Sequence, residues 1–203
     1  MKSMIRITIA LLICMSSGFG DELRLEDIVQ AILLQCHGPE DPTPDAELAD
    51  YARVHGLSNA EVSRILVSFI EDGLQGGGDN LQRQLTAGAL SALARFGGEQ
   101  EIDYVRSIVQ TTEDAGLKRR AIFVGMRLSP EKWEEWIRYV ATDNHFDSLT
   151  RFITYQEAYR IGKNKDELTR QRVEQVLSEF ADKDPSPGNC EELRKWSAEL
   201  KAR

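Results

Sequence analysis

The sequence predicts an all-α protein, on the strength of two observations. In almost every segment after the first twenty residues, apolar side chains recur at the three- and four-residue spacing of one helix face. Glycine, proline or a capping side chain separates these segments. In addition, residues 81–142 contain two similar helical hairpins in succession. Such hairpins stack in an α-solenoid, because one hairpin cannot bury both of its apolar faces alone.

The repeat is visible in the apolar positions of the two hairpins. The first helices match at an offset of 32 residues: Leu85, Ala89, Leu90, Leu93 and Phe96 against Leu117, Ala121, Ile122, Gly125 and Leu128. The second helices match at an offset of 31: Ile102, Val105, Ile108 and Val109 against Trp133, Trp136, Tyr139 and Val140. Gly97-Gly98 breaks the first copy, and Ser129-Pro130 breaks the second. We expect Ser129 to cap the helix that Pro130 opens.

The run AGALSALARFGG at residues 87–98, followed by a helix with Ile102 and Val105, resembles a HEAT-type repeat, in particular the short form of phycobilisome lyase-like proteins. The resemblance covers about a third of the chain and depends on small and apolar residues. It implies a short right-handed α-α superhelix with N- and C-terminal capping helices, and usually a protein-binding surface. It implies no catalytic residue. The alternative is a helical bundle in which two hairpins look alike by chance.

The first twenty residues have the layout of a secretory signal peptide. Two basic residues precede an apolar run at 7–15, and Gly18 and Gly20 form a small-x-small site for cleavage after Gly20. The apolar run is too short to span a bilayer. We therefore expect a periplasmic or secreted protein with no integral membrane segment after cleavage. The alternative is a lipoprotein modified at Cys14, but Ile13 stands where lipidation signals need a small side chain.

The charge argues against nucleic acid as a partner. The formal net charge is −8, and removal of the expected signal peptide takes away two basic residues and no acidic ones, which leaves −10. A chain of this sign repels phosphate backbones, and the sequence has no basic patch with interleaved aromatic residues to offset it.

Residues 21–75 predict an N-terminal unit of three helices. The first covers about residues 25–36. Thr43 is expected to cap the second, which ends at Gly56. Its predicted core face consists of Leu48, Tyr51 and Val54.

The third helix of this unit has the clearest amphipathic pattern in the chain. Ser58 and Glu61 form a capping box ahead of the apolar positions Val62, Ile65, Leu66, Phe69 and Ile70. The glycines at 76–78 then predict a linker, since the lysine and hydroxyl residues of a phosphate-binding loop do not follow them.

Beyond residue 142 the repeat weakens. His145 lies between two aspartates in the connector 143–147, and we expect helix capping there in preference to a metal site. The helix after the connector is expected to end at Gly162, and Asn164 with Glu167 to cap the next one. The apolar residues of that next helix are Leu168, Val173, Val176, Leu177 and Phe180.

A last helix is predicted after the loop 182–188, capped by Asn189 and Glu192. Its apolar stripe is Leu193, Trp196 and Leu200. We expect this helix to cover the end of the stack, so that residues 81–203 form one domain with residues 21–75.

Two cysteines remain after the expected cleavage, Cys36 and Cys190. An oxidising compartment favours a bridge between them. Because the two residues lie near opposite ends of a predicted solenoid, two separate thiols are the equally weighted alternative.

The sequence has no motif for hydrolysis, metal binding or dinucleotide binding, so we expect no cofactor, no metal and no catalytic residue. His37, His55 and His145 all fall near predicted helix ends. The pairs Glu134-Glu135 and Glu191-Glu192 are adjacent on helices and point in different directions. Two carboxylates brought together from distant segments would still suffice for glycosidase chemistry, so an enzyme stays open.

The candidate binding residues lie on the second helices, which line the concave side of stacked hairpins. Their expected outward positions are Tyr104, Arg106, Glu135 and Arg138. Tyrosine and arginine are frequent at interface hot spots. Trp133 and Trp136 lie instead on the apolar stripe, and we expect both to serve in core packing.

The sequence therefore predicts an exported, non-catalytic interaction or scaffold module that presents a helical-repeat surface to a protein partner. Two alternatives stay open. One is a helical cell-envelope enzyme that uses an acidic groove, and the other is a structural accessory subunit of an envelope complex.

Overall fold

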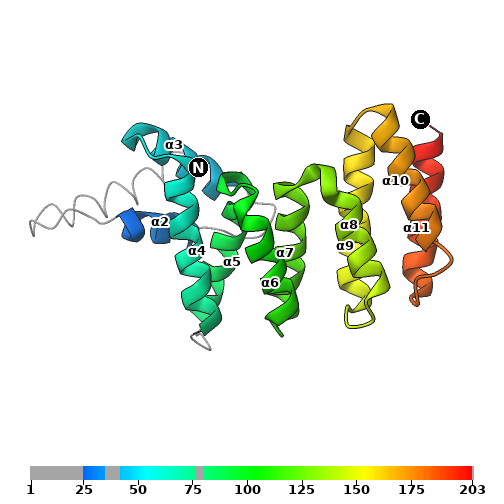
Figure 1. Ribbon diagram of the computed structural model, residues 1–203, viewed down its shortest axis with the longest axis horizontal. Helices are drawn as coiled ribbons and strands as arrows, with labels where there is room; N and C mark the ends of the chain where they lie inside the picture. Colours follow the sequence, from blue (N-terminus) through cyan, green and yellow to red (C-terminus); the bar gives the residue numbers. More distant parts are fainter. Residues whose placement is uncertain (1–24, 35–41, 76–79, 203) are drawn as a thin grey trace, which may run out of the picture. The chain divides into compact units, whose positions relative to one another are not determined.

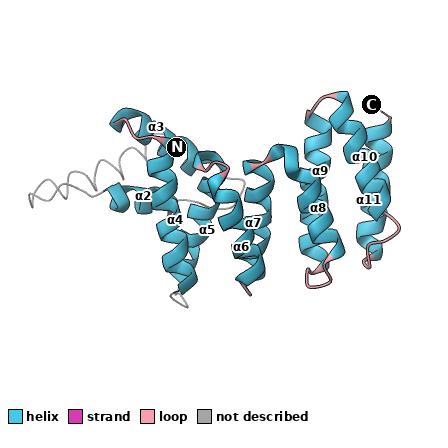
Figure 2. Cartoon of the chain, viewed as in Figure 1, coloured by secondary structure: helices cyan, strands magenta, loops and turns pink. Residues whose placement is uncertain are grey.

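The computed structural model describes residues 25–34, 42–75 and 80–202, and this part of the chain consists of helices and loops with no strand (Figure 2), which confirms the predicted all-α class. The expected signal peptide, the glycine linker at 76–78 and Cys36 lie outside the described residues. Nowhere in the described ranges is a helix both long enough and apolar enough to cross a membrane.

The helices follow one another along the chain as labelled in Figure 1. They are α2 (Leu25–Leu33), α3 (Pro42–His55), α4 (Asn59–Gln75), α5 (Asn80–Phe96), α6 (Gln100–Thr111), α7 (Ala115–Leu128), the 3₁₀ helix η1 (Pro130–Lys132), α8 (Trp133–Thr142), α9 (Ser148–Asn164), α10 (Glu167–Phe180) and α11 (Pro187–Lys201). The chain divides into two compact units between Gly97 and Gly98, so that α2 to α5 belong to the first and α6 to α11 to the second.

Helix α5 is central to the first unit, because α2, α3 and α4 all contact it, α4 most extensively. Gln84 of α5 donates from Nε2 to the Leu34 carbonyl oxygen at 2.9 Å and so binds the end of α2. The five apolar positions of α5 predicted from the repeat are all buried. They pack with the buried residues of the other three helices, Val29, Ile32, Leu33, Leu48, Ala52, Val62, Leu66 and Ile70.

The turn between α3 and α4 follows the prediction. Gly56 has a φ of +67°, a conformation that favours glycine, and α3 ends just before it. The capping box is also confirmed. The Ser58 N–H donates to Glu61 Oε2 at 2.8 Å, and the Glu61 N–H donates to Ser58 Oγ at 3.3 Å.

Two predictions for α3 are wrong. The helix begins at Pro42, so it already includes Thr43, which was expected to precede it as a cap. Val54 was expected in the core and is 68% exposed, whereas Ala52 is buried. Leu48 and Ala52 are four residues apart and share one stripe of the helix, and Val54, six residues from Leu48, falls on another side.

The second unit consists of two layers of helices. Consecutive helices pack on one another from α6 to α11, and α7, α9 and α11 also contact each other in that order. Helices α8 and α10 contact each other in the other layer. The core between the layers includes the predicted apolar positions Ile102, Val105, Ile108, Val109, Ala121, Ile122, Trp133, Trp136, Val140, Val173, Val176, Leu177, Phe180, Leu193, Trp196 and Leu200. Leu168, in the first turn of α10, is 69% exposed and lies outside it.

Aspartates cap three helices of this unit. Asp114 accepts from the Gly116 and Leu117 N–H groups, Asp147 accepts from Thr150 at 2.6 Å, and Asp166 accepts from Thr169 at 2.9 Å. A carboxylate at a helix start pairs with N–H groups that have no partner within the helix. Asp147 therefore bears out the expectation that the connector at 143–147 serves helix capping.

Other predicted caps in the second unit are wrong. Asp166, not Asn164, caps α10. Gly162 does not end α9, which continues to Asn164. A side chain at Gly162 would stand 2.9 Å from Cβ of Val173, so close packing, and not helix termination, accounts for the glycine.

Ser129 and Asn189 also differ from their predicted capping roles. The Ser129 hydroxyl donates back to the Gly125 carbonyl oxygen at 3.0 Å, and η1 precedes α8. Helix α11 starts at Pro187, which places Asn189 inside the helix. Its amide donates to the Ser148 carbonyl oxygen and to Asp184, both at 3.1 Å.

One packing contact joins α7 and α8. The indole of Trp136 lies directly on the backbone of α7 at Gly125, where a Cβ atom would stand 2.2 Å from Cζ2 of the indole. A separation below 3.0 Å requires a shift of the backbone or the ring, because the indole is 1% exposed and is enclosed by the core. Glycine at 125 is thus a condition for the position of Trp136.

We predict that Gly125→Ala lowers the free energy of unfolding by about 1–3 kcal/mol through overpacking. If there were no clash, alanine would stabilise the helix relative to glycine, because it has the higher helix propensity. Gly188→Ala is the control, since the nearest atom to its Cβ would be Ser186 Oγ at 4.0 Å. Thermal melting followed by circular dichroism measures both. Equal or higher stability of the Gly125 variant would contradict the packing described above.

The cap of α9 predicts a pH dependence. The hydrogen bond that Asp147 accepts from the Thr150 N–H lowers the pKa of Asp147, and this effect outweighs its partial burial, which raises the pKa. A carboxyl whose pKa is lower in the folded chain contributes stability above its unfolded pKa and loses it as the pH falls through the folded pKa. Asp147→Ala should cost about 1 kcal/mol near pH 6 and distinctly less near pH 2.5, as measured by urea unfolding. A difference that does not change with pH would argue against a charged cap.

Candidate functional site

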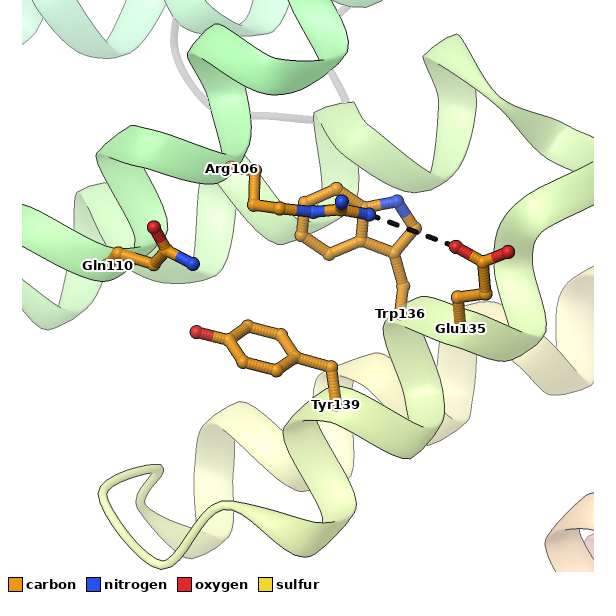
Figure 3. A pocket seen from close by; sticks show the side chains of 5 residues that line it. All are labelled: Arg106, Gln110, Glu135, Trp136 and Tyr139. Atoms are coloured by element: carbon orange, nitrogen blue, oxygen red, sulfur yellow. Dashed lines mark ion pairs between the residues drawn. The ribbon is translucent and has the colours of Figure 1, made fainter.

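A groove lies between α6 and α8 in the second unit. Figure 3 shows the five side chains that line it: Arg106 and Gln110 from α6, and Glu135, Trp136 and Tyr139 from α8. Its volume is about 230 Å³, similar to the volume of one large side chain. The aromatic rings give it an apolar interior, and the charged groups lie at one end.

Arg106 connects the two sides of the groove. Its guanidinium carbon lies 5.5 Å from the ring centroid of Trp136, within the range of a cation–π contact. Its Nη2 atom is 3.8 Å from Glu135 Oε2 (dashed in Figure 3). The side chains of Arg106 and Glu135 are 41% and 64% exposed, and an exposed pair at this distance contributes little to stability.

The two aromatic residues occupy different depths. Trp136 is buried, whereas Tyr139 is half-buried and packs edge-on against Phe146 at a centroid distance of 5.4 Å. Burial raises the pKa of the Tyr139 hydroxyl, and the nearby Asp143 carboxylate raises it further. The hydroxyl is therefore neutral at physiological pH and can both donate and accept a hydrogen bond.

The buried indole nitrogen of Trp136 has no hydrogen-bond acceptor among the described residues. A buried N–H group left in this state costs about 1–3 kcal/mol. Buried tryptophans usually place this group against a partner. The groove lining therefore includes a hydrogen-bond donor that has no acceptor within the part of the chain that the structure describes.

The structure brings together two of the four residues predicted from sequence, Arg106 and Glu135. Tyr104 is half-buried on α6, and Arg138 pairs toward α10; neither lines the groove. Sequence reasoning missed Gln110 and Tyr139 as groove residues. The predicted core position of Trp136 is confirmed by its burial, and the indole in addition forms part of the groove lining.

Arg138 belongs to an ion-pair network between α8 and α10. It donates to Glu134 at 3.0 Å and to Glu179 at 2.8 Å, and Arg172 donates to Glu134 at 2.7 Å. The hydrogen bond to Glu179 is the main reason that the pKa of Arg138 is raised. With the Arg106–Glu135 pair, charged contacts thus run from α6 across α8 to α10.

A second polar cluster is buried at the loop between α10 and α11. Asp184 accepts from the Tyr155 hydroxyl at 2.9 Å and from Asn189 at 3.1 Å, and its Oδ2 is 3.3 Å from Arg151 Nε. Burial, reinforced by Asp184, raises the pKa of Tyr155 far above its usual value. These groups pair with one another across α9, the loop and α11, which indicates a structural role. The sequence signal was weak, since Asp184 lies in a loop rich in proline.

The remaining sequence candidates are dispersed. His145 Nδ1 lies 2.8 Å from Asp143, while Asp147 caps α9. Within the described ranges, no three His, Cys, Asp or Glu side chains form a group that could hold a metal ion. Sγ of the half-buried Cys190 lies 3.2 Å from the Asp184 carbonyl oxygen. Because Cys36 lies outside the described residues, the bridge between them stays a prediction.

We predict that Asp184→Asn lowers the free energy of unfolding by roughly 3–5 kcal/mol, because it leaves the Arg151 charge buried without its counter-ion. The side chains of Arg151 and Asp184 are 8% and 0% exposed. Asp182→Asn is the matched control, since this aspartate is 79% exposed and pairs with Arg194 at the surface. The control should change stability by less than about 0.5 kcal/mol in the same melting experiment. Similar losses for the two variants would refute a special role of the buried pair.

Comparison with protein-family models, curated proteins and solved structures gave no match for this chain. Its function has to be inferred from its own residues. Of the features described above, the groove between α6 and α8 is the one that is concave, partly apolar and open to a ligand.

Proposed function

We propose that this protein is a non-catalytic, exported interaction module, and that the groove between α6 and α8 binds a segment of a protein partner. The single observation that carries the proposal is the lining of the groove. A buried indole and a half-buried tyrosine stand beside an arginine whose side chain is partly exposed. Tryptophan, tyrosine and arginine are the residues most enriched at interface hot spots.

The proposal includes the predicted architecture, a short right-handed HEAT-like superhelix with capping helices at its ends. The contacts of the second unit support it: α7, α9 and α11 in one layer, with α8 and α10 in the other. In a superhelix of this kind the second helix of each hairpin faces the concave side. The groove residues belong to two such helices, and a binding site is expected on that side.

Export is part of the proposal because of the predicted signal peptide, and the location is then periplasmic or secreted. The partner is a protein, since the acidic chain is a poor ligand for nucleic acid. Cofactor and metal have no place in the proposed mode of binding.

The state of the acidic side chains favours binding over the envelope-enzyme alternative. A general acid needs a carboxyl group with a raised pKa. Although burial opposes it, hydrogen bonds from Arg172 and Arg138 lower the pKa of Glu134. The pKa of Glu179 is lowered by hydrogen bonds from Arg138 and Lys183. Carboxylates held ionised in this way shape a charged surface and are poor proton donors.

The test is site-specific photo-crosslinking in the natural compartment. A benzoylphenylalanine in place of Gln110, which lines the groove, should crosslink to one protein. The same group in place of Gln156, an exposed residue of α9, should not. The captured protein is then purified and titrated against the full chain to give a dissociation constant.

For that purified partner, Tyr139→Ala should weaken binding about tenfold, because it removes half of the aromatic lining. Tyr104→Ala is the matched control: it removes a tyrosine from α6 that does not line the groove. Circular dichroism melting confirms that both variants fold. If Tyr104→Ala abolishes binding and Tyr139→Ala does not, the partner uses another surface and the proposal is wrong.

A further inference from the structure

We infer that the groove selects a partner segment with an acidic side chain, Asp or Glu, next to a large apolar one. The inference rests on the proposed function and names the chemistry that the same groove would recognise. Three features carry it: the hydrogen-bonding capacity of Arg106, the unpaired nitrogen of Trp136, and the weak ion pair between Glu135 and Arg106.

Arg106 is the first feature. A guanidinium carries five N–H donors in a planar fork that fits a carboxylate in a bidentate manner. At 3.8 Å, its contact with Glu135 is too long for a hydrogen bond. Its guanidinium also lies over the face of Trp136 and is close enough to Tyr139 to interact with it electrostatically. A stronger carboxylate ligand can therefore bind Arg106 without breaking a hydrogen bond of the free protein.

Trp136 supplies a second donor for the same ligand. Its Nε1 atom is buried and has no acceptor within the described part of the chain. Figure 3 shows the Arg106 guanidinium, the indole nitrogen and the Glu135 carboxylate together at one end of the groove. A carboxylate there would accept from the guanidinium. It would reach the indole nitrogen, which is shielded from solvent in the free protein, once the guanidinium shifts off the ring face. A cationic or apolar ligand group could accept from neither donor.

Glu135 indicates that Arg106 prefers a carboxylate ligand, and it also lowers the affinity for one. Its own carboxylate is the group that approaches Arg106 in the free protein, and it is 64% exposed. It can turn into solvent when a partner carboxylate arrives. Glu135 would then repel the incoming acid from close by, so that it acts as an internal competitor that lowers the affinity for acidic segments.

The apolar neighbour of the acid follows from the rest of the lining. Beyond the charged end, the groove continues between the rings of Trp136 and Tyr139 (Figure 3). Its volume of about 230 Å³ suits one aromatic or large aliphatic side chain. A segment with both groups in succession would fill the groove and pair with its donors.

The test selects a random heptapeptide library, displayed on phage, against the full chain. Clones are then assayed against Tyr139→Ala to identify those that depend on the groove. We expect the groove-dependent clones to be enriched at least about fivefold in Asp or Glu beside an aromatic or large aliphatic residue.

A synthetic peptide with the sequence of the strongest groove-dependent clone is then titrated against variants of the charged end, which measures the contribution of each charge to affinity. Arg106→Gln should weaken binding about tenfold or more, and Glu135→Gln should strengthen it about three- to tenfold. Glu131→Gln, an exposed acid outside the groove lining, is the matched control and should leave binding unchanged. Melting curves confirm that each variant is folded.

The outcomes separate the two proposals. Groove-dependent clones without acidic residues, or a peptide that Arg106→Gln binds as well as the wild type, would overturn the acidic preference and leave the groove as a binding site. If Glu131→Gln strengthens peptide binding as much as Glu135→Gln does, the gain in affinity reflects net charge alone. That result would also overturn the acidic preference. A library without any groove-dependent clone would overturn the proposed function and this inference with it.

Discussion

The contact between Trp136 and Gly125 is the constraint on which the groove depends. The indole lies on the backbone of α7 because residue 125 has no side chain, and Arg106 from α6 covers the same ring. Three helices thus meet at one residue. The depth of the ring leaves only part of it for a ligand, and it also removes the indole nitrogen from water without supplying an acceptor. The packing that holds the helices together therefore creates the unpaired donor of the groove.

Charge is organised differently at the surface and in the interior of the second unit. At the surface, arginines and glutamates alternate from α6 across α8 to α10 in pairs whose side chains are all partly exposed to solvent. In the interior, Arg151 and Asp184 form a buried pair, and removal of either partner would leave the other charge buried without a counter-ion. Under the proposed function, a ligand carboxylate would take the place of Glu135 in the surface pair with Arg106. The buried pair suits the joining of α9 to the loop before α11.

The candidate site could be predicted in part from sequence. Arg106 and Glu135 were found because the hairpin pattern places them outward on the second helices. Tyr139 and Trp136 were assigned to the apolar stripe, since a helical pattern marks one face and cannot tell a ring that is wholly enclosed from one that also borders a groove. Arg138 was placed on the same surface, but a partner on α10, 41 residues along the chain, draws it away.

The sequence by itself determined the helical class, the apolar faces and several helix ends, because these follow from spacing and from local hydrogen bonds such as the Ser58–Glu61 capping box. The tertiary structure alone decided which glycines end a helix and which allow close packing, and which carboxylates meet which arginines. Gly56 and Gly162 look alike in sequence, yet one adopts a positive φ and the other lies against Val173. The difference arises from residues distant in the chain, whose approach no local pattern encodes.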